Sequence, residues 1–203
     1  MVDWPKEVHD RLPLYVKTIR DWKENADLML GVYGDTKWDD YSVQVGPPGK
    51  GPELDKVING LLAEGGGGPG FRESSELVAY FSNEHIETPN AISPTLIIIG
   101  DEAFYDSVDP AQVQKVFGDT IQGPINSVEL WKQLGQRFDI FHLRKEYTLS
   151  PARNDKIQAQ WEEAIGPQNV IPVYNKERFE VIDVALGILA KKWGCESDFL
   201  KNL

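Results

Sequence analysis

The segment Thr95-Leu96-Ile97-Ile98-Ile99 is the most hydrophobic stretch of the chain, and it constrains the fold more than any other feature. An extended strand with this sequence carries apolar side chains on both of its faces. Such strands are typical of the centre of a parallel sheet, where helices cover each face. We therefore expect an α/β fold with a mostly parallel, Rossmann-like sheet and helices on both faces.

Helical and strand patterns alternate along the rest of the chain, which supports this fold class. Short apolar or alternating segments predict strands at 28–33, 41–45, 138–143 and 170–173. Helical spacing predicts helices at 5–22, 52–63, from near 71–74 to 81, 110–118, 127–134, 154–165 and 179–193. We expect Pro13 to kink the first helix or to begin a second one. Since there is no internal repeat and no long linker, we expect one domain over residues 1–203.

Composition excludes several classes of function. Against 21 Lys and Arg stand 32 Asp and Glu, a net charge of −11 that disfavours binding to nucleic acid or to an anionic membrane surface. Cys195 is the single cysteine, so an internal disulfide framework and a cysteine zinc site are excluded, and we expect a buried or idle thiol. The chain lacks a membrane-spanning apolar run, and its start does not resemble a signal peptide. We expect a soluble, cytoplasmic protein.

Three loops carry candidate functional residues, because ligands of open α/β sheets bind at the carboxyl ends of the strands. They are Gly34-Asp35-Thr36, the segment 65–75, and Gly100-Asp101-Glu102. Asp101 is the strongest candidate, since it stands where the chain leaves a dry apolar strand; the alternative is that it caps the next turn or accepts loop amides. Asp35 either lies on the same face or is an ordinary turn carboxylate.

Other chemical patterns are weak. The glycines at 65, 67 and 70 have the spacing of a dinucleotide loop, but they follow a helix where the mechanism requires a strand. His9, His85 and His142 match no metal spacing and are interpreted as structural. The segment Trp38-Asp39-Asp40-Tyr41 is interpreted as a loop with solvated charges.

Several segments in order resemble von Willebrand factor A-like domains over most of residues 8–110. They are Gly31-Val32-Tyr33-Gly34-Asp35, the segment 43–46, the Glu-Gly-Gly-Gly-Gly loop after 61–63, the segment 72–77, and 96–102. The resemblance implies a metal-ion-dependent adhesion site, in which Asp101 corresponds to the aspartate after the fourth strand. It further implies that Ser74 or Glu73 assists from the middle loop and that Asp35 lies in an outer shell.

One part of the family pattern is missing. The Asp-x-Ser-x-Ser motif occurs nowhere in the chain, and no strand precedes the first helix. We expect that the sequence begins inside the motif, as a truncated gene model, a fragment or a shortened variant. The missing strand would lie between those near 28–33 and 95–99. The chain alone is then marginally stable, or the two flanking strands close on each other.

The resemblance implies a protein-interaction module and not an enzyme. A divalent ion, Mg²⁺, would hold an acidic side chain of a partner protein, although we expect weak or absent metal binding in this chain. The alternative is a Mg²⁺-dependent hydrolase or nucleotide-binding α/β domain that uses Asp101, Glu102 and the glycine loop, with Arg72 as its phosphate contact. A metal-free scaffold is the third hypothesis.

Overall fold

The structure is a computed structural model that describes residues 4–62, 64, 70–146, 150–173 and 180–201. The chain divides into two compact units, each assembled from separate stretches. Unit 1 comprises Met1–Gly31, Val45–Ala63 and Val173–Leu203, and unit 2 comprises Val32–Gln44 and Glu64–Pro172. The expectation of a single domain stays a prediction.

Unit 1 is built from helices. They are α1 (Trp4–Trp22), α2 (Glu53–Gly60), α7 (Glu180–Trp193) and α8 (Glu196–Leu200). An ion pair of 3.2 Å between Arg11 and Asp183 joins α1 to α7. The ring of Trp22 meets Phe199 edge to face, at 6.2 Å between centroids. Ile19 is fully buried, so the core of unit 1 packs helix on helix.

Two features of unit 1 differ from the sequence prediction. Helix α1 continues through Pro13 as one helix, so the expectation of a second helix beginning there is wrong. Proline removes one hydrogen-bond donor, and the packed apolar face of the helix, with Val16 and Ile19 buried, offsets that loss. Helix α8 was not predicted, because five residues carry too little periodicity to be recognised.

The longest strand pair of unit 2 is parallel. β4 (Thr95–Gly100) pairs with β8 (Asp139–Lys145), which places Ile98 opposite His142. β9 (Val170–Val173) follows at the edge in the order β4-β8-β9, as predicted from Pro172. These pairs confirm an α/β fold with parallel strands, in which the apolar segment 95–99 forms a strand.

The remaining strands are short. They are β1 (Gly31–Tyr33), β2 (Val43–Val45), β3 (Arg72–Glu73), β5 (Ala103–Phe104), β6 (Ser107–Val108) and β7 (Ile125–Asn126). β3 pairs with β5 in parallel, and β6 pairs with β7 antiparallel. β1 pairs with β2, and the N–H of Gly34 donates to the carbonyl of Ser42 at 2.8 Å.

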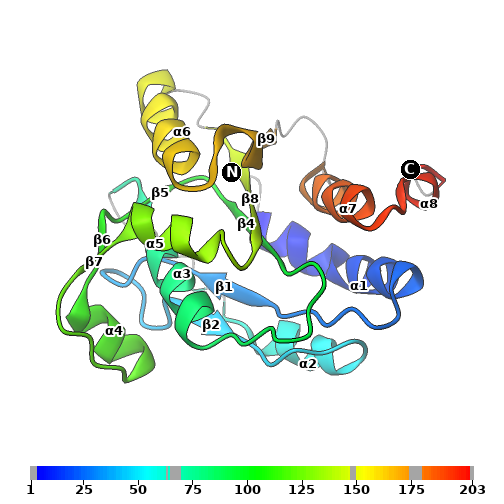
Figure 1. The fold of residues 1–203 in the computed structure, drawn as a ribbon, viewed down its shortest axis with the longest axis horizontal. Helices are drawn as coiled ribbons and strands as arrows, with labels where there is room; N and C mark the ends of the chain where they lie inside the picture. Colours follow the sequence, from blue (N-terminus) through cyan, green and yellow to red (C-terminus); the bar gives the residue numbers. More distant parts are fainter. Residues whose placement is uncertain (1–3, 63, 65–69, 147–149, 174–179, 202–203) are drawn as a thin grey trace. The chain divides into compact units, whose positions relative to one another are not determined.

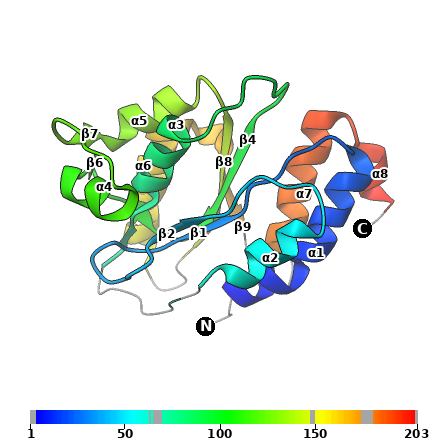
Figure 2. The same ribbon diagram turned by 90° about the horizontal axis from the view of Figure 1, so that it is seen from below.

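Helices of unit 2 cover one face of the β4–β8 pair (Figures 1 and 2). They are α3 (Ser75–Glu84), α5 (Ser127–Leu134) and α6 (Pro151–Ile165), with the 3-10 helix η1 (Pro167–Asn169) after them, while α4 (Pro110–Phe117) lies beside β6 and β7. Ile98 and Ile140 share a core with Trp131 of α5 and Trp161 of α6. The rings of Trp131 and Trp161 lie 5.2 Å apart, and Phe104 lies 4.9 Å from Trp161. Helices on both faces stay a prediction.

Local signals predicted the ends of α4 and α5, whereas α3 continues to Glu84, beyond the predicted 81, and α6 begins at Pro151, before the predicted 154. Asp109 caps α4 with its carboxylate, and Gly118 ends that helix with φ at 79°, both as predicted. Helix α5 is capped by the side chain of Asn126 and not by Ser127, which is its first residue. The Asn126 side chain accepts the Glu129 N–H at 3.0 Å. Asn and Ser are both common helix caps, so the residue types alone did not distinguish Asn126 from Ser127.

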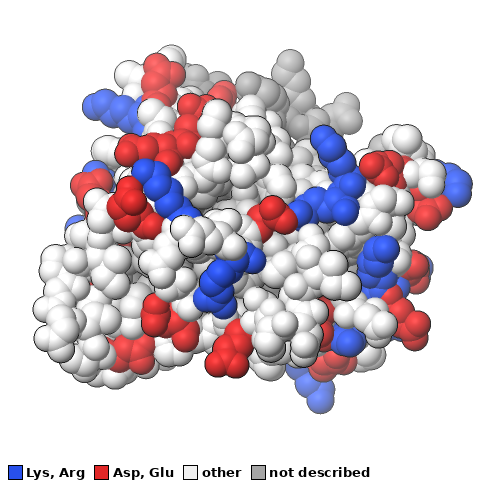
Figure 3. Space-filling model, in the orientation of Figure 1, with Lys and Arg blue, Asp and Glu red and all other residues white. Residues whose placement is uncertain are grey.

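Charged side chains of both signs are mixed on the face drawn in Figure 3, where Lys and Arg are scattered among Asp and Glu. No helix in the described part of the chain combines the length and the apolar character needed to cross a bilayer.

Candidate functional site at the ends of β1 and β4

The loops that follow β1, β3 and β4 meet within unit 2. The N–H of Ser74 donates to the carbonyl of Gly34 at 3.0 Å, which ties the start of α3 to the end of β1. The hydroxyl of Tyr33 donates to the carbonyl of Ile99 at 3.4 Å, which ties β1 to the end of β4. The four residues predicted from the sequence, Asp35, Glu73, Ser74 and Asp101, all stand on these loops or beside them.

Glu73 and Asp101 are two neighbouring carboxylates that have no side-chain partner among the described residues. Burial, followed by the charges of Asp101, Glu102, Asp39 and Asp35 in that order, raises the pKa of Glu73 to about 8. Within the described residues, neither Glu73 nor Asp101 forms a hydrogen bond or an ion pair through its side chain. An ionised pair here repels itself, so a proton or an added cation stabilises it.

Ser74 is fully buried, and its hydroxyl holds two loops together. Its Oγ accepts the Thr36 N–H at 3.1 Å and lies 2.9 Å from Thr36 Oγ1. Ser74 thus fixes the loop after β1 against the start of α3.

Asp35 is buried, and both oxygens of its carboxylate accept hydrogen bonds. One oxygen accepts the Tyr105 hydroxyl at 2.8 Å, and the other accepts the Lys37 N–H at 3.0 Å. The Lys37 ammonium lies 4.1 Å from the centre of the Tyr105 ring. Burial raises the pKa of Tyr105, with Asp35 as the next cause, so the phenol stays protonated and donates. Asp35 therefore holds the loop in place, and it acts on Glu73 only through the repulsion between their charges.

Asp39 does not fit the interpretation of a solvated loop charge. It is half-buried and its Oδ2 accepts the Asp35 N–H at 2.7 Å. A Cβ on residue 34 would collide with this carboxylate, which explains why Gly34 stands there. The Gly-Asp pair at 34–35 was the available signal, but nothing in the sequence linked it to Asp39.

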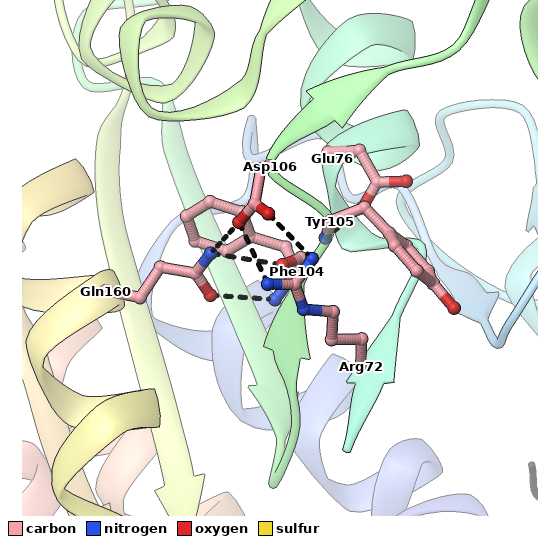
Figure 4. A network of polar contacts seen from close by, with 6 residues as sticks. All are labelled: Arg72, Glu76, Phe104, Tyr105, Asp106 and Gln160. Atoms are coloured by element: carbon pink, nitrogen blue, oxygen red, sulfur yellow. Dashed lines mark hydrogen bonds and ion pairs between the residues drawn. The ribbon is translucent and has the colours of Figure 1, made fainter. Parts of the chain in front are cut away.

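Glu76 is a further buried carboxylate that sequence reasoning missed (Figure 4). Its side chain is 0% exposed, Oε2 accepts the Tyr105 N–H at 3.1 Å, and Oε1 has no partner in the described part of the chain. Burial is the largest cause that raises the pKa of Glu76 to about 8, and the charge of Asp35 acts in the same direction, whereas the hydrogen bond from the Tyr105 N–H opposes it. A glutamate in the first turn of a helix normally faces water, so the sequence carried no sign of its burial.

Glu102 and Arg72 already have charged partners. Both oxygens of Glu102 lie 2.9 Å from Nη2 of Arg153. Arg72 forms a two-pronged pair with Asp106, at 2.9 and 3.0 Å, beside Gln160 (Figure 4). A phosphate ligand would have to displace Asp106 from Arg72, which weakens the prediction that Arg72 is a phosphate contact.

The histidines and the cysteine have structural surroundings where they are described. The buried ring of His142 stacks on Trp161 at 4.0 Å, and burial, followed by the charge of Arg144, lowers its pKa to about 3. His85 lies 2.6 Å from Asp119. Cys195 is buried as predicted, and the side chain of His9 lies outside the described residues.

The fit of a metal ion to this site is partial. Within the described residues, no three or more His, Cys, Asp or Glu side chains are grouped so that they could hold a metal ion. Glu73 and Asp101 offer carboxylate oxygens, whereas Asp35 and Glu102 are engaged elsewhere. Mg²⁺ keeps several water ligands and accepts one or two carboxylates, so this donor set fits a weakly held magnesium ion.

Comparison of the chain with protein-family models, with curated proteins and with solved structures found no match.

Proposed function

We propose that this chain is a protein-interaction module of the von Willebrand factor A type, which binds a partner through a weakly held divalent ion. The observation that supports the proposal most directly is the pair Glu73 and Asp101 at the ends of β3 and β4, for which the described part of the chain provides no side-chain partner. A cation relieves the repulsion between these carboxylates. A magnesium ion with open positions can then accept a carboxylate from a partner protein.

The sheet order supports a von Willebrand A-like fold. The strands form one set in the order β2-β1 and another in the order β4-β8-β9. A single sheet with one strand missing between β1 and β4 has this arrangement. The cytoplasmic location stays a prediction from the sequence.

The residues of the site divide into two roles. Glu73 and Asp101 would hold the ion, which supplies a coordination position for the partner. Asp35 and Ser74 keep the loops in place through Tyr105 and Thr36.

Calorimetry with MgCl₂ tests the proposal through the protons that binding releases. With a pKa of about 8, Glu73 is roughly 90% protonated at pH 7, so ion binding should release about one proton. The measurement is the binding enthalpy in two buffers of different ionisation enthalpy. We expect a Kd of about 1 mM or weaker, given two carboxylates only.

Two variants make this test specific. Glu73→Gln should abolish both ion binding and proton release. Glu129→Gln is the matched control, since Glu129 is an exposed carboxylate paired with Lys132 at 2.9 Å. Proton release that persists in Glu73→Gln, or a Kd of about 1 μM or tighter, would contradict the proposal.

A further inference from the structure

The edge of β4 that faces away from β8 is open. The Asp139 N–H donates to the carbonyl of Pro94 at 2.9 Å, so residues 94, 96 and 98 direct their backbone groups toward β8. Backbone direction alternates along a strand, so Thr95, Ile97 and Ile99 direct theirs the other way. In the described part of the chain, the Tyr33 hydroxyl at Ile99 is the single hydrogen bond to this edge.

The edge of β1 that faces away from β2 is open as well. The Gly34 N–H donates to Ser42, which directs the backbone of residues 32 and 34 toward β2. The backbone of Tyr33 then faces the opposite way, and no described residue pairs with it. The contact between Tyr33 and Ile99 shows that the two open edges lie on either side of one gap.

The Tyr33 contact sets an upper limit on the width of this gap. A tyrosine side chain reaches roughly 6 Å from its Cα atom by ordinary bond lengths. Its hydrogen bond to Ile99 adds 3.4 Å. The backbones at this point are therefore at most about 10 Å apart, and two strand spacings of about 4.8 Å fall within that limit. One extended segment would pair with both edges by displacing the Tyr33 side chain.

The walls of the gap indicate the chemistry of the segment that would fill it. Ile97 and Ile99 belong to the most hydrophobic strand of the chain, yet both are part-exposed. At the carboxyl end stand Glu73 and Asp101, whose charges raise the pKa of Tyr33 after the effect of burial. An apolar segment that ends in a cation complements both regions.

We propose that the gap between β1 and β4 is a strand-insertion site for an extended peptide that is apolar on both faces and carries lysine or arginine at its carboxyl end. Main-chain hydrogen bonds to both edges would supply affinity, and the carboxylates would set the direction of the peptide. The proposal does not depend on a metal ion, so it is tested in the presence of EDTA.

Fluorescence anisotropy with labelled peptides provides the test. The probe is Thr-Val-Ile-Val-Thr-Ile-Lys-Lys, and the control is the same composition in reverse order, Lys-Lys-Ile-Thr-Val-Ile-Val-Thr. We expect the probe to bind about 10-fold more tightly or better, because only its lysines reach the carboxylates. Equal binding of the two peptides would overturn the proposal.

Backbone methylation distinguishes insertion from pairing with a single edge. Two versions of the probe carry N-methyl groups at odd or at even positions, and each version loses the donors toward one edge. Insertion between two edges predicts that both versions lose binding. If one version keeps full affinity, the peptide pairs with one edge alone and the insertion site is refuted.

Two variants place the binding in the gap. Tyr33→Phe removes the hydroxyl that occupies the Ile99 carbonyl, so we expect about 2- to 10-fold tighter probe binding. Ile97→Pro removes an N–H from the open edge and leaves the β8 ladder donors in place, so the probe should no longer bind. Ile97→Val is its control, and circular dichroism checks folding. Unchanged affinity in both Tyr33→Phe and folded Ile97→Pro would refute this location.

Discussion

The buried carboxyl group of Glu76 makes the stability of the protein depend on pH in a direction that one substitution can reverse. Glu76 is 0% exposed, and its pKa is raised from 4.5 to about 8. Between these pH values the folded chain keeps a proton that the unfolded chain has lost. The free energy of unfolding therefore falls as pH rises, and the loss is complete above about pH 8.

The size of the effect follows from the shift. Each pH unit costs about 1.4 kcal/mol, so Glu76 lowers stability by about 3 kcal/mol at pH 7 relative to pH 4.5. Glu76→Gln cannot ionise and removes this loss. Its amide keeps an acceptor for the Tyr105 N–H, but its NH₂ group takes the place of Oε1, which has no described partner, at a cost of about 1–2 kcal/mol.

Urea unfolding, followed by tryptophan fluorescence, measures the outcome from about pH 5 to pH 8. Trp131 and Trp161 report on the same core that carries α3. We expect Glu76→Gln to be about 1 kcal/mol less stable than the parent at pH 5 and about 2–3 kcal/mol more stable at pH 8. Glu73 is present in both proteins, so its titration contributes equally to the two stability curves and does not affect their difference. EDTA excludes metal effects, and Glu129→Gln serves as the exposed control. Parallel pH curves for parent and Glu76→Gln would refute the reasoning.

Three further substitutions test the packing of unit 2 by the same unfolding assay. Gly100→Ala should destabilise the parent by about 1–3 kcal/mol, because the new Cβ collides with the Tyr33 hydroxyl, and it should cost much less in Tyr33→Phe; equal costs in both backgrounds would contradict the contact. Gly118→Ala should lower the free energy of unfolding by about 1 kcal/mol, because φ is 79° at this position and no described atom crowds the added Cβ. An unchanged free energy of unfolding would contradict that backbone conformation. Trp161→Ala should cost about 3–5 kcal/mol because it empties the centre of the aromatic core, and thermal unfolding should show the same ranking.

The parts of the fold that the sequence predicted are those with strong local signals. The segment 95–99 forms β4 because four apolar residues in a row after Thr95 suit a buried parallel strand. Asp109, Pro110 and Gly118 bound α4 because each residue satisfies a fixed geometric need at a helix end. Neither result depends on distant residues.

The parts that sequence reasoning missed depend on distant residues. β3 and β5 have two residues each, which is too short for any periodicity, and they exist because they pair with each other. Glu76 is buried because Tyr105, which is 29 positions away, donates to it. Sequence spacing contains no record of such a contact.

The candidate site was predicted in composition but not in roles. Strand ends that share one edge of a sheet predicted Asp35, Glu73, Ser74 and Asp101, and their forming a site stays a prediction. Asp35 and Ser74 have hydrogen-bond partners, whereas the described residues provide no side-chain partner for Glu73 or Asp101. The capture of Glu102 by Arg153 across 51 positions is likewise a tertiary effect.

The division of the chain has a consequence for the order in which the protein can fold during translation. All residues of unit 2 have been synthesised once residue 172 is added, whereas unit 1 needs stretches from the start, the middle and the end of the chain. Helix α1 emerges early from the ribosome, yet Asp183, its ionic partner on α7, is made much later. Synthesis of unit 2 is therefore complete before that of unit 1, and α1 cannot pack against α7 until residues 180–193 have been made.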